Sequence, residues 1–190
     1  DIHPTLGRTT TAELDSLDVI LFKRSNMNLS DLALSSTERF LEYCDRYGIY
    51  VESETAVCFV DTYRQKNYAP GKTQDSAEFT PRYLSQCREM VKSFRSHPSI
   101  LFAIGNESVY GTNFQQCWDW VKATDKTRPV IFSYPGSVGE KKPVYDILSM
   151  HYQDVNGNLN QWNRSTHGFQ GEGIPALFDE WAHPACYTYA

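Results

Sequence analysis

The sequence lacks several features that would indicate particular partners. It has no basic run, and 18 lysine and arginine residues against 23 aspartate and glutamate residues give a formal net charge of −5. Such a balance argues against nucleic acid or an anionic membrane as the main partner. We recognise no signal peptide and no apolar run of membrane-spanning length in the 190 residues. The compartment stays open, with cytoplasmic and periplasmic locations both compatible with the sequence.

Motifs for metals and nucleotides are also missing. The five cysteines form no CxxC pair, and the five histidines show no HxxxH-type spacing, which disfavours a metal hydrolase. Gly71-Lys72-Thr73 imitates the end of a phosphate-binding loop, but Lys66 stands where the first glycine is needed. We therefore expect no metal site and no cofactor.

The pattern that is present is an alternation of strands and helices. A chain of this length suits one domain with a real core, and the alternation predicts a parallel sheet with right-handed crossovers. Aromatic residues make up 14% of the sequence. They suit a packed core and also a sugar-binding cleft, and composition does not separate the two.

Two of the predicted strands end on glutamates. Ile100–Ile104 is a short apolar run, typical of a buried parallel strand, and Gly105-Asn106-Glu107 follows it directly. A later strand ends on Asp179-Glu180. Glycoside hydrolysis uses two carboxyl groups, one to protonate the leaving oxygen and one across the sugar. Spacing alone is a weak signal, because many α/β enzymes place acids at strand ends and most single glutamates are solvated loop residues.

Longer motifs resemble a known family. Cys44-Asp-Arg-Tyr-Gly-Ile-Tyr-Val51 and Gly105-Asn-Glu-Ser-Val-Tyr-Gly111 are similar to segments of the catalytic barrel of glycoside hydrolase family 2, especially its β-galactosidases. Asp1–Arg8, Asp125–Pro129 and Asp179–His183 resemble the same family in the same order. The resemblance implies a (β/α)8 TIM barrel, with residues 1–190 forming one partial catalytic domain. It also implies hydrolysis of terminal β-glycosides by retaining double displacement, and β-sandwich domains that accompany the barrel.

The resemblance also implies roles for individual residues. Glu107 corresponds to the general acid/base and Glu180 to the nucleophile, so we expect their carboxyl groups roughly 5 to 5.5 Å apart. Asn106 would contact the sugar 2-hydroxyl, Tyr152 would hydrogen-bond the nucleophile, and His183 would reach the sugar. Considered alone, Tyr152 is typical of a core tyrosine and His183 of a loop histidine. The predicted substrate-binding set is Asn106, Tyr152, His183, Trp181 and His151.

The chain departs from the family at several points. Ser30–Ser36 replaces an Arg-Thr-Ser-His-Tyr-Pro segment, so an arginine and a histidine of the sugar site are absent. Ala103 stands where the family has Trp-Ser, and this deletion would reverse the facing of the strand unless a bulge absorbs it. The third strand ends on Ser53-Glu54 in place of Asp-Glu, and the magnesium ligands of some members have no counterpart.

These departures define an alternative function. We expect strands two to seven of the barrel, with strands one and eight missing, and therefore an open barrel of about six strands. The alternative to an active β-glycosidase is an inactivated or altered barrel fragment that acts at most as a carbohydrate-binding module. We further expect little or no glycosidase activity from this chain alone, because sugar-positioning groups are missing.

Overall fold

The computed structural model describes residues 5–7, 9–32, 36–58, 60, 73–133, 146–151 and 175–180. Their strands form one six-stranded parallel sheet in chain order: β1 (Leu29–Leu32), β2 (Tyr50–Glu54), β3 (Ile100–Asn106), β4 (Val130–Ser133), β5 (Ile147–His151) and β6 (Ala176–Glu180). The helices are α1 (Ala12–Arg24), α2 (Glu38–Tyr47), α3 (Thr80–Phe94) and α4 (Thr112–Thr124). This arrangement, in which each strand pairs with the next, is that of a parallel barrel, and the described strand count agrees with the six expected.

Local sequence signals begin and end the helices. The Thr11 hydroxyl accepts a hydrogen bond from the Leu14 amide at the start of α1, and Thr37 does the same for the Phe40 amide in α2. Such caps satisfy amides that have no partner within the helix. Gly48 ends α2 with φ of 68°, a left-handed conformation that glycine adopts without strain.

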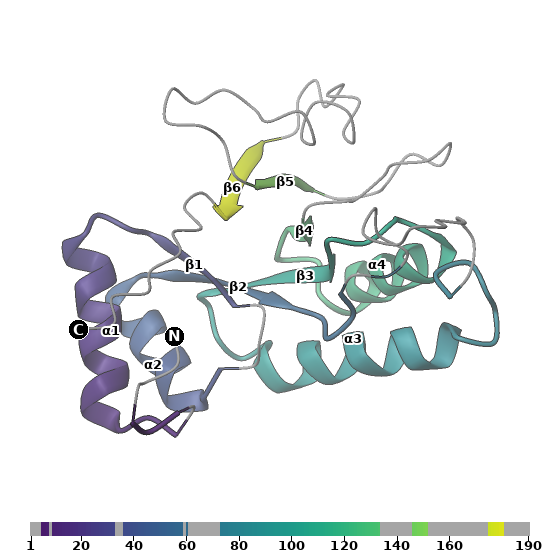
Figure 1. Cartoon of the computed structure of the whole chain (residues 1–190). Coiled ribbons are helices and arrows are strands. Elements are labelled where there is room, and N and C mark those ends of the chain that lie inside the picture. Colours follow the sequence, from purple (N-terminus) through teal and green to yellow (C-terminus); the bar gives the residue numbers. More distant parts are fainter. Residues whose placement is uncertain are drawn as a thin grey trace.

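The hydrophobic core lies between the sheet and its helices. Figure 1 shows α1, α2 and α3 on one side of β1–β3 and β5 and β6 on the other, with α4 beside the end of β3. The strands contribute Val51, Ile100, Phe102, Ile104, Val130 and Phe132 to this core, and the helices contribute Leu41, Cys44, Cys87, Val91, Phe114, Cys117 and Val121. All are buried, and each large side chain removed from water stabilises the fold by about 1.5–3 kcal/mol.

The sheet is strongly curved, and the face away from the hydrophobic core lies on the inside of the curve; we call it the inner face. The curve brings β6 over β1, with Cα atoms of the two strands within 8 Å of one another (Figure 1). Asp31 on β1 pairs in register with Glu52 on β2, and Glu54 lies two positions further along the same strand. Residues two apart on a strand share a face. The inner face therefore carries carboxyl groups where the outer face carries the hydrophobic core.

Two bulges adjust which residues face inward. In β3, the register shifts between Ala103 and Asn106, which pair with Ile131 and Ser133, so β3 has one extra residue there. In β6, Phe178 pairs with Met150 of β5 and Glu180 pairs with His151, so β6 has one extra residue between these two pairs. An extra residue breaks the strict alternation of faces. The first bulge turns the end of β3 toward the inner face, and it lies next to Ala103, where a bulge is expected to compensate for the missing residue.

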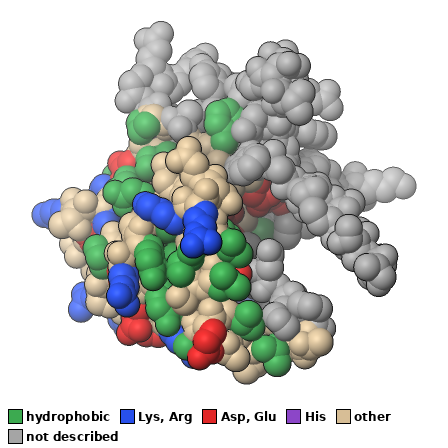
Figure 2. All heavy atoms as spheres, turned by 90° about the vertical axis from the view of Figure 1, so that its left-hand side faces the viewer, with side chains coloured by type: hydrophobic (Ala, Val, Ile, Leu, Met, Phe, Trp, Pro, Cys, Tyr) green, Lys and Arg blue, Asp and Glu red, His purple; other side chains and the backbone are tan. Residues whose placement is uncertain are grey.

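The side formed by α1 and α2 presents apolar side chains to the surface. Figure 2 shows hydrophobic side chains among charged ones over this side of the molecule. Leu17 and Leu21, one helical turn apart on α1, are 48% and 46% exposed. Within the described part of the chain, none of the helices combines the length and apolar character needed to span a bilayer.

Candidate active site

Glu107 follows the end of β3 in a constrained backbone conformation. Its φ is 40°, a region that costs a non-glycine residue about 1–3 kcal/mol and recurs at functional sites. The Glu107 amide donates to the Ser133 carbonyl at 3.0 Å, which fixes the turn against β4. The side chain is 5% exposed. The fold therefore holds this carboxyl group in a defined place at the end of the sheet.

A close aromatic contact supports the same turn from the core. A Cβ atom added to Gly105 would lie 2.4 Å from Phe114 Cε1 and 3.1 Å from Phe132 Cε2. These two rings contact each other edge to face, with centroids 4.9 Å apart. Only glycine fits between β3 and this aromatic pair, so Gly105 lets the backbone that carries Glu107 approach the core closely.

Asn106 faces the inner side because of the β3 bulge. Its Nδ2 donates to Glu54 Oε2 at 2.6 Å, while its backbone amide donates to the Val57 carbonyl at 3.3 Å. The Asn106 Oδ1 atom is buried and has no hydrogen-bond partner within the described residues. The amide is therefore oriented by Glu54, with its oxygen left as an acceptor.

Asp179 and Glu180 end β6 and both take part in inner-side contacts. Asp179 Oδ2 accepts hydrogen bonds from the Ser133 hydroxyl at 3.2 Å and from the Ser149 hydroxyl. The Glu180 amide donates to Asp179 Oδ1 at 3.1 Å. The Asp179 side chain is fully buried, and that of Glu180 is 26% exposed. Asp179 thus anchors the strand end, whereas Glu180 is the more accessible of the two acids.

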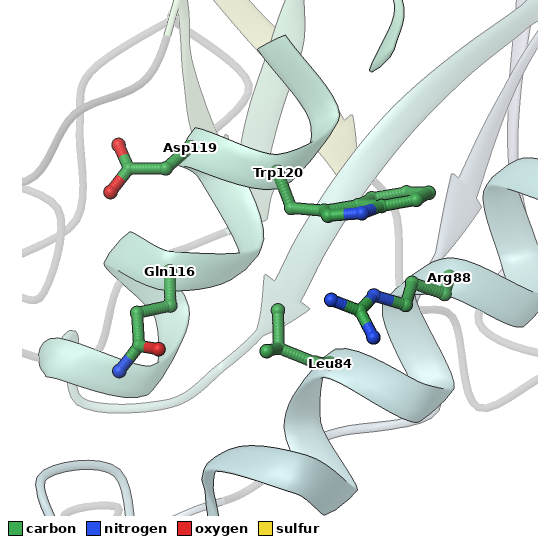
Figure 3. Close-up of a pocket in the computed structure, with 5 residues that line it drawn as sticks. All are labelled: Leu84, Arg88, Gln116, Asp119 and Trp120. Atoms are coloured by element: carbon green, nitrogen blue, oxygen red, sulfur yellow. The ribbon is translucent and has the colours of Figure 1, made fainter. Parts of the chain in front are cut away.

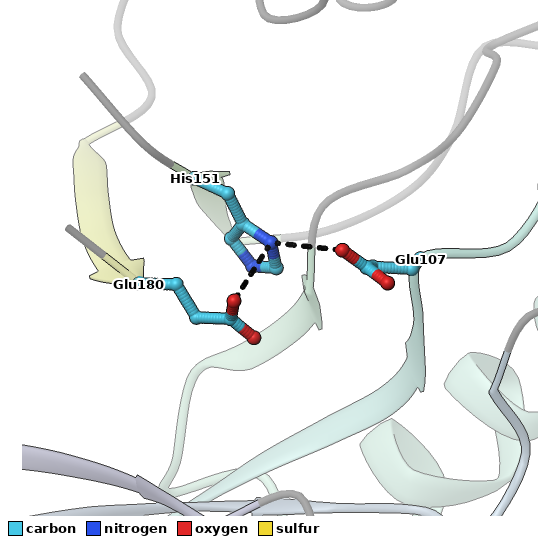
Figure 4. A group of neighbouring side chains, drawn as sticks. All are labelled: Glu107, His151 and Glu180. Atoms are coloured by element: carbon cyan, nitrogen blue, oxygen red, sulfur yellow. Dashed lines mark ion pairs between the residues drawn. The ribbon is translucent and has the colours of Figure 1, made fainter. Parts of the chain in front are cut away.

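His151 lies between the two glutamates (Figure 4). Its Nδ1 atom is 3.6 Å from Glu107 Oε1 and 3.7 Å from Glu180 Oε2, while Nε2 is 3.2 Å from Asp179 Oδ1. One oxygen from each glutamate and the histidine nitrogen all lie within 4.8 Å of one another. The structure therefore brings Glu107, Glu180 and His151 together from three different strands, with the two carboxylates at close range.

These contacts favour a protonated imidazole. Burial alone would lower the pKa of His151, but its interactions with Asp179 and Glu107 and the negative charge of Glu180 outweigh burial and raise the pKa to about 10. A protonated imidazole donates from both nitrogens and offers no lone pair to a metal. The arrangement therefore suits a cationic bridge between the acids more than a metal centre.

Three further acids line the inner face beside this group. Burial, and then the charges of Glu54, Asp179 and Glu180, raise the pKa of Asp31 to about 8. Burial is also the main cause that raises the pKa of Glu54 to about 7, with Asn106 opposing it. The pKa of fully buried Glu52 is raised well above its usual range by burial and then by Asp179.

Sequence reasoning assigned no role to Asp179, Glu52 or Glu54. The signal for Glu52 and Glu54 was their spacing of two on a strand. The inward position of Asp179 could not be predicted without the β6 bulge. In a regular strand, consecutive residues face opposite sides, so either Asp179 or Glu180 would point outward.

Three predicted substrate-binding residues, Tyr152, Trp181 and His183, lie outside the described residues. Their roles stay predictions, as do the catalytic and binding roles of Glu107, Glu180, Asn106 and His151.

A separate hollow lies on the helical side of the molecule. It is an open groove between α3 and α4, lined by Leu84, Arg88, Gln116, Asp119 and Trp120 (Figure 3). The Arg88 guanidinium lies 5.5 Å from the centroid of the Trp120 ring, a cation–π contact that joins the two helices. The groove includes none of the inner-face acids, and its contacts are those of helix packing.

Sequence comparison links the chain to sugar hydrolases. A β-galactosidase of Pectobacterium atrosepticum is 30% identical over 189 residues, which cover 95% of this chain and 17% of that enzyme. A β-galactosidase of Vibrio vulnificus strain YJ016 is 32% identical over 156 residues, which cover 81% of this chain and 14% of that enzyme. The chain thus spans less than a fifth of the length of these curated relatives.

Solved structures share the fold. The GH2 β-galacturonidase from Eisenbergiella tayi, bound to galacturonate, superposes with a TM-score of 0.70 at 21% identity, covering 98% of this chain and 35% of that one. The apo structure of β-glucuronidase 3 from Bacteroides uniformis superposes with a TM-score of 0.58 at 19% identity. The match covers 75% of this chain and 18% of that one.

The sequence profile described as "Glycosyl hydrolases family 2, TIM barrel domain" matches residues 1–187. The chain therefore belongs to glycosyl hydrolase family 2 and represents its TIM barrel domain.

Proposed function

We propose that Glu107 and Glu180 are the two carboxyl groups of a retaining β-glycosidase site. The observation that supports this most is their proximity, since one oxygen from each lies within 4.8 Å of the other. Retaining enzymes hold their carboxyl groups about 5–5.5 Å apart, whereas inverting enzymes leave about 6.5–9.5 Å for a water molecule. The observed approach is shorter than the separation of inverting enzymes and fits direct attack of one carboxylate on the sugar.

The roles follow from the family motifs and the exposures. Glu107 donates a proton to the glycosidic oxygen while Glu180, which is the more exposed, attacks the anomeric carbon and forms a glycosyl ester; the glycosidic C–O bond breaks, and the aglycone leaves as an alcohol. Glu107 then takes a proton from water, which attacks the same carbon and releases Glu180. His151 contacts both carboxyl groups and holds them at a fixed separation while charge moves between them.

A neutral β-galactoside is the proposed substrate. The curated relatives are β-galactosidases, and the inner face beside the site carries Asp31, Glu52, Glu54 and Asp179. Whether protonated or ionised, these acids offer no positive charge to pair with the carboxylate of a uronic acid, so they disfavour the sugars named for the structural neighbours. Asn106 Oδ1 is available to accept from a sugar hydroxyl. We also propose that β-sandwich domains accompany the barrel in the whole protein.

A second candidate function is sugar binding without turnover. The observation that favours it is Asp31, which stands in the segment where the family supplies sugar-positioning residues and which carries a pKa of about 8. A misplacement of about 1 Å can lower a rate a hundredfold. We therefore infer that the 190-residue chain alone turns over sugars slowly or not at all.

Covalent labelling tests both candidates. The chain is incubated with a mechanism-based 2-fluoro β-galactoside, and the modified residue is located by peptide mass spectrometry. A retaining site places one label on Glu180, and Glu180→Gln abolishes it. A folded chain that binds β-galactosides but acquires no label supports the binding module. Turnover of a chromogenic β-glucuronide in preference to the β-galactoside would contradict the proposed substrate.

A further inference from the structure

Asp31, Glu52 and Glu54 form a compact group of carboxyl groups on β1 and β2, here called the acidic trio. One oxygen from each lies within 4.8 Å of the oxygens of the other two. Asp31 and Glu52 are partners in the sheet register, and Glu54 is two residues from Glu52 on the same face. Two adjacent strands therefore fix the three carboxyl groups in one place, independently of loops.

Four of the six carboxyl oxygens of the trio are buried without a hydrogen-bond partner among the described residues, whereas Glu54 Oε2 accepts from Asn106 Nδ2 at 2.6 Å. Glu52 is fully buried, and neither of its oxygens meets a hydrogen-bond donor within the described residues. Asp31 Oδ1 and Glu54 Oε1 are likewise buried without a partner there. Among the described residues, no lysine, arginine or histidine forms an ion pair with any of the three.

The cationic His151 acts on Asp31 and Glu54 but forms no ion pair with any member of the trio, so the arrangement calls for a further positive species. A buried, unpaired carboxylate is strongly unfavourable, so the charge must be removed by a proton or balanced by a cation. Asp179 and Glu180 add further negative charge to the same region. Protons would have to neutralise the three acids one at a time. A single divalent cation balances two negative charges and also contacts an oxygen of each acid.

We propose that the acidic trio is a binding site for a divalent cation of the calcium class. Calcium takes six to eight oxygen ligands at about 2.3–2.6 Å, so two oxygens on opposite sides of the ion are about 4.8 Å apart. One oxygen from each member of the trio lies within that span of one oxygen from each of the other two. Three carboxylates favour calcium over magnesium, which usually takes one or two carboxylates and keeps several waters. The ligands of the trio are all oxygens, as hard cations prefer, and the Asp179 carboxyl, which interacts with Glu52, adds negative charge beside them.

This site differs from the Glu107, His151 and Glu180 group and has a pH signature of its own. Burial, and then nearby negative charge that includes Asp179, raises the pKa of Asp31 to about 8 and that of Glu54 to about 7, while the charge of His151 opposes both shifts. The ion must therefore displace protons, and its binding strengthens as the pH rises.

Calorimetry on the chain after EDTA treatment provides the test. Calcium chloride and magnesium chloride are titrated separately at pH 6 and pH 8, in two buffers with different heats of ionisation. We expect one calcium ion per chain, at least about tenfold tighter binding at pH 8 because protons are released, and weaker magnesium binding. Calcium at a hundred times its Kd should raise the Tm by about 5–10 °C.

Variants locate the ion. Glu52→Gln and Asp31→Asn should each weaken calcium binding by at least about tenfold, since even partners behind metal ligands contribute 10–100-fold. Glu42→Gln, a matched change of an exposed α2 residue, should leave binding unchanged. Both trio variants lose a buried acid and should melt no lower than the wild type without calcium, which shows that they fold.

Three outcomes would overturn the proposal. The first is a folded chain that binds no calcium at pH 8, which means that protons alone neutralise the trio. The second is calcium binding that Glu52→Gln and Asp31→Asn leave intact. The third is binding that Glu107→Gln abolishes while the trio variants retain it, which would place the ion between the two glutamates.

Discussion

Replacing Asp31 with asparagine should make the chain more stable at neutral pH. In the folded chain Asp31 keeps its proton up to about pH 8, because it is buried beside Glu54, Asp179 and Glu180, whereas its ordinary pKa is 3.8. The folded state therefore binds one more proton than the unfolded state between these two values. Its contribution to stability is fully present below pH 3.8 and is lost as the pH rises through 8.

The magnitude follows from the width of this window. Each pH unit inside it lowers the free energy of unfolding by about 1.4 kcal/mol, so the wild type should lose roughly 4 kcal/mol between pH 5 and pH 8 from this group. Asparagine does not titrate, so Asp31→Asn should escape that loss. The stability difference between variant and wild type should grow across this range and level off above pH 8.

Urea denaturation followed by tryptophan fluorescence at pH 5, 6, 7, 8 and 9, in EDTA, measures this difference. Glu42→Gln provides the control, because Glu42 is exposed on α2 and should track the wild type at every pH. Parallel pH profiles for Asp31→Asn and the wild type would refute the reasoning. They would show that Asp31 reaches solvent or a cationic partner in the folded chain.

Three other changes give separate tests. Gly105→Ala places a Cβ atom against Phe114 and should cost about 1–3 kcal/mol of unfolding free energy, seen as a lower urea midpoint; an unchanged midpoint would mean that the ring moves aside without strain. His97→Gln removes contacts of 2.6 and 3.0 Å to two carboxylates, so we expect a loss of about 1.5–3 kcal/mol at pH 6. Burial lowers the pKa of His97, but its two carboxylate partners outweigh burial and raise the pKa above the ordinary value of 6.5. The loss of stability in the variant should therefore shrink as the pH rises above 6.5. A loss that does not change with pH would contradict a charged contact. Asp179→Asn weakens the support of His151, so the His151 pKa, followed by the imidazole NMR shift, should fall from about 10; an unchanged titration would assign that shift to the glutamates alone.

The parts of the fold that the sequence predicts best are those with strong local signals. The apolar run within Ile100–Asn106 predicted a buried strand, and its position before Glu107 predicted a carboxyl group at the sheet end. The strand Leu29–Leu32 has a weak sequence signal because it contains Ser30 and Asp31, and aspartate in particular is depleted in strands; here Asp31 faces the acidic inner side. Sheet pairing with β2, a non-local contact, decides its conformation.

The site was predictable only in part, for a geometric reason. Motifs identified Glu107 and Glu180, but the bulges in β3 and β6 decide that Asn106 and Asp179 also face inward. A bulge depends on the register between two strands, and no single strand sequence specifies it. The charge state of His151 likewise arises from acids on other strands, which only the folded chain brings together.

The approach of β6 to β1 has a consequence for how the chain folds. Every strand pairing in the described sheet joins neighbours in the chain, whereas this approach brings its first strand to its last. Closing so long a loop carries a large entropic penalty, so we expect this contact to form after the main barrier. Asp31 would then lose water late, and raising the pH from 6 to 8 should speed unfolding far more than it slows refolding. In a stopped-flow chevron plot, the unfolding limb would shift with pH while the folding limb stays in place.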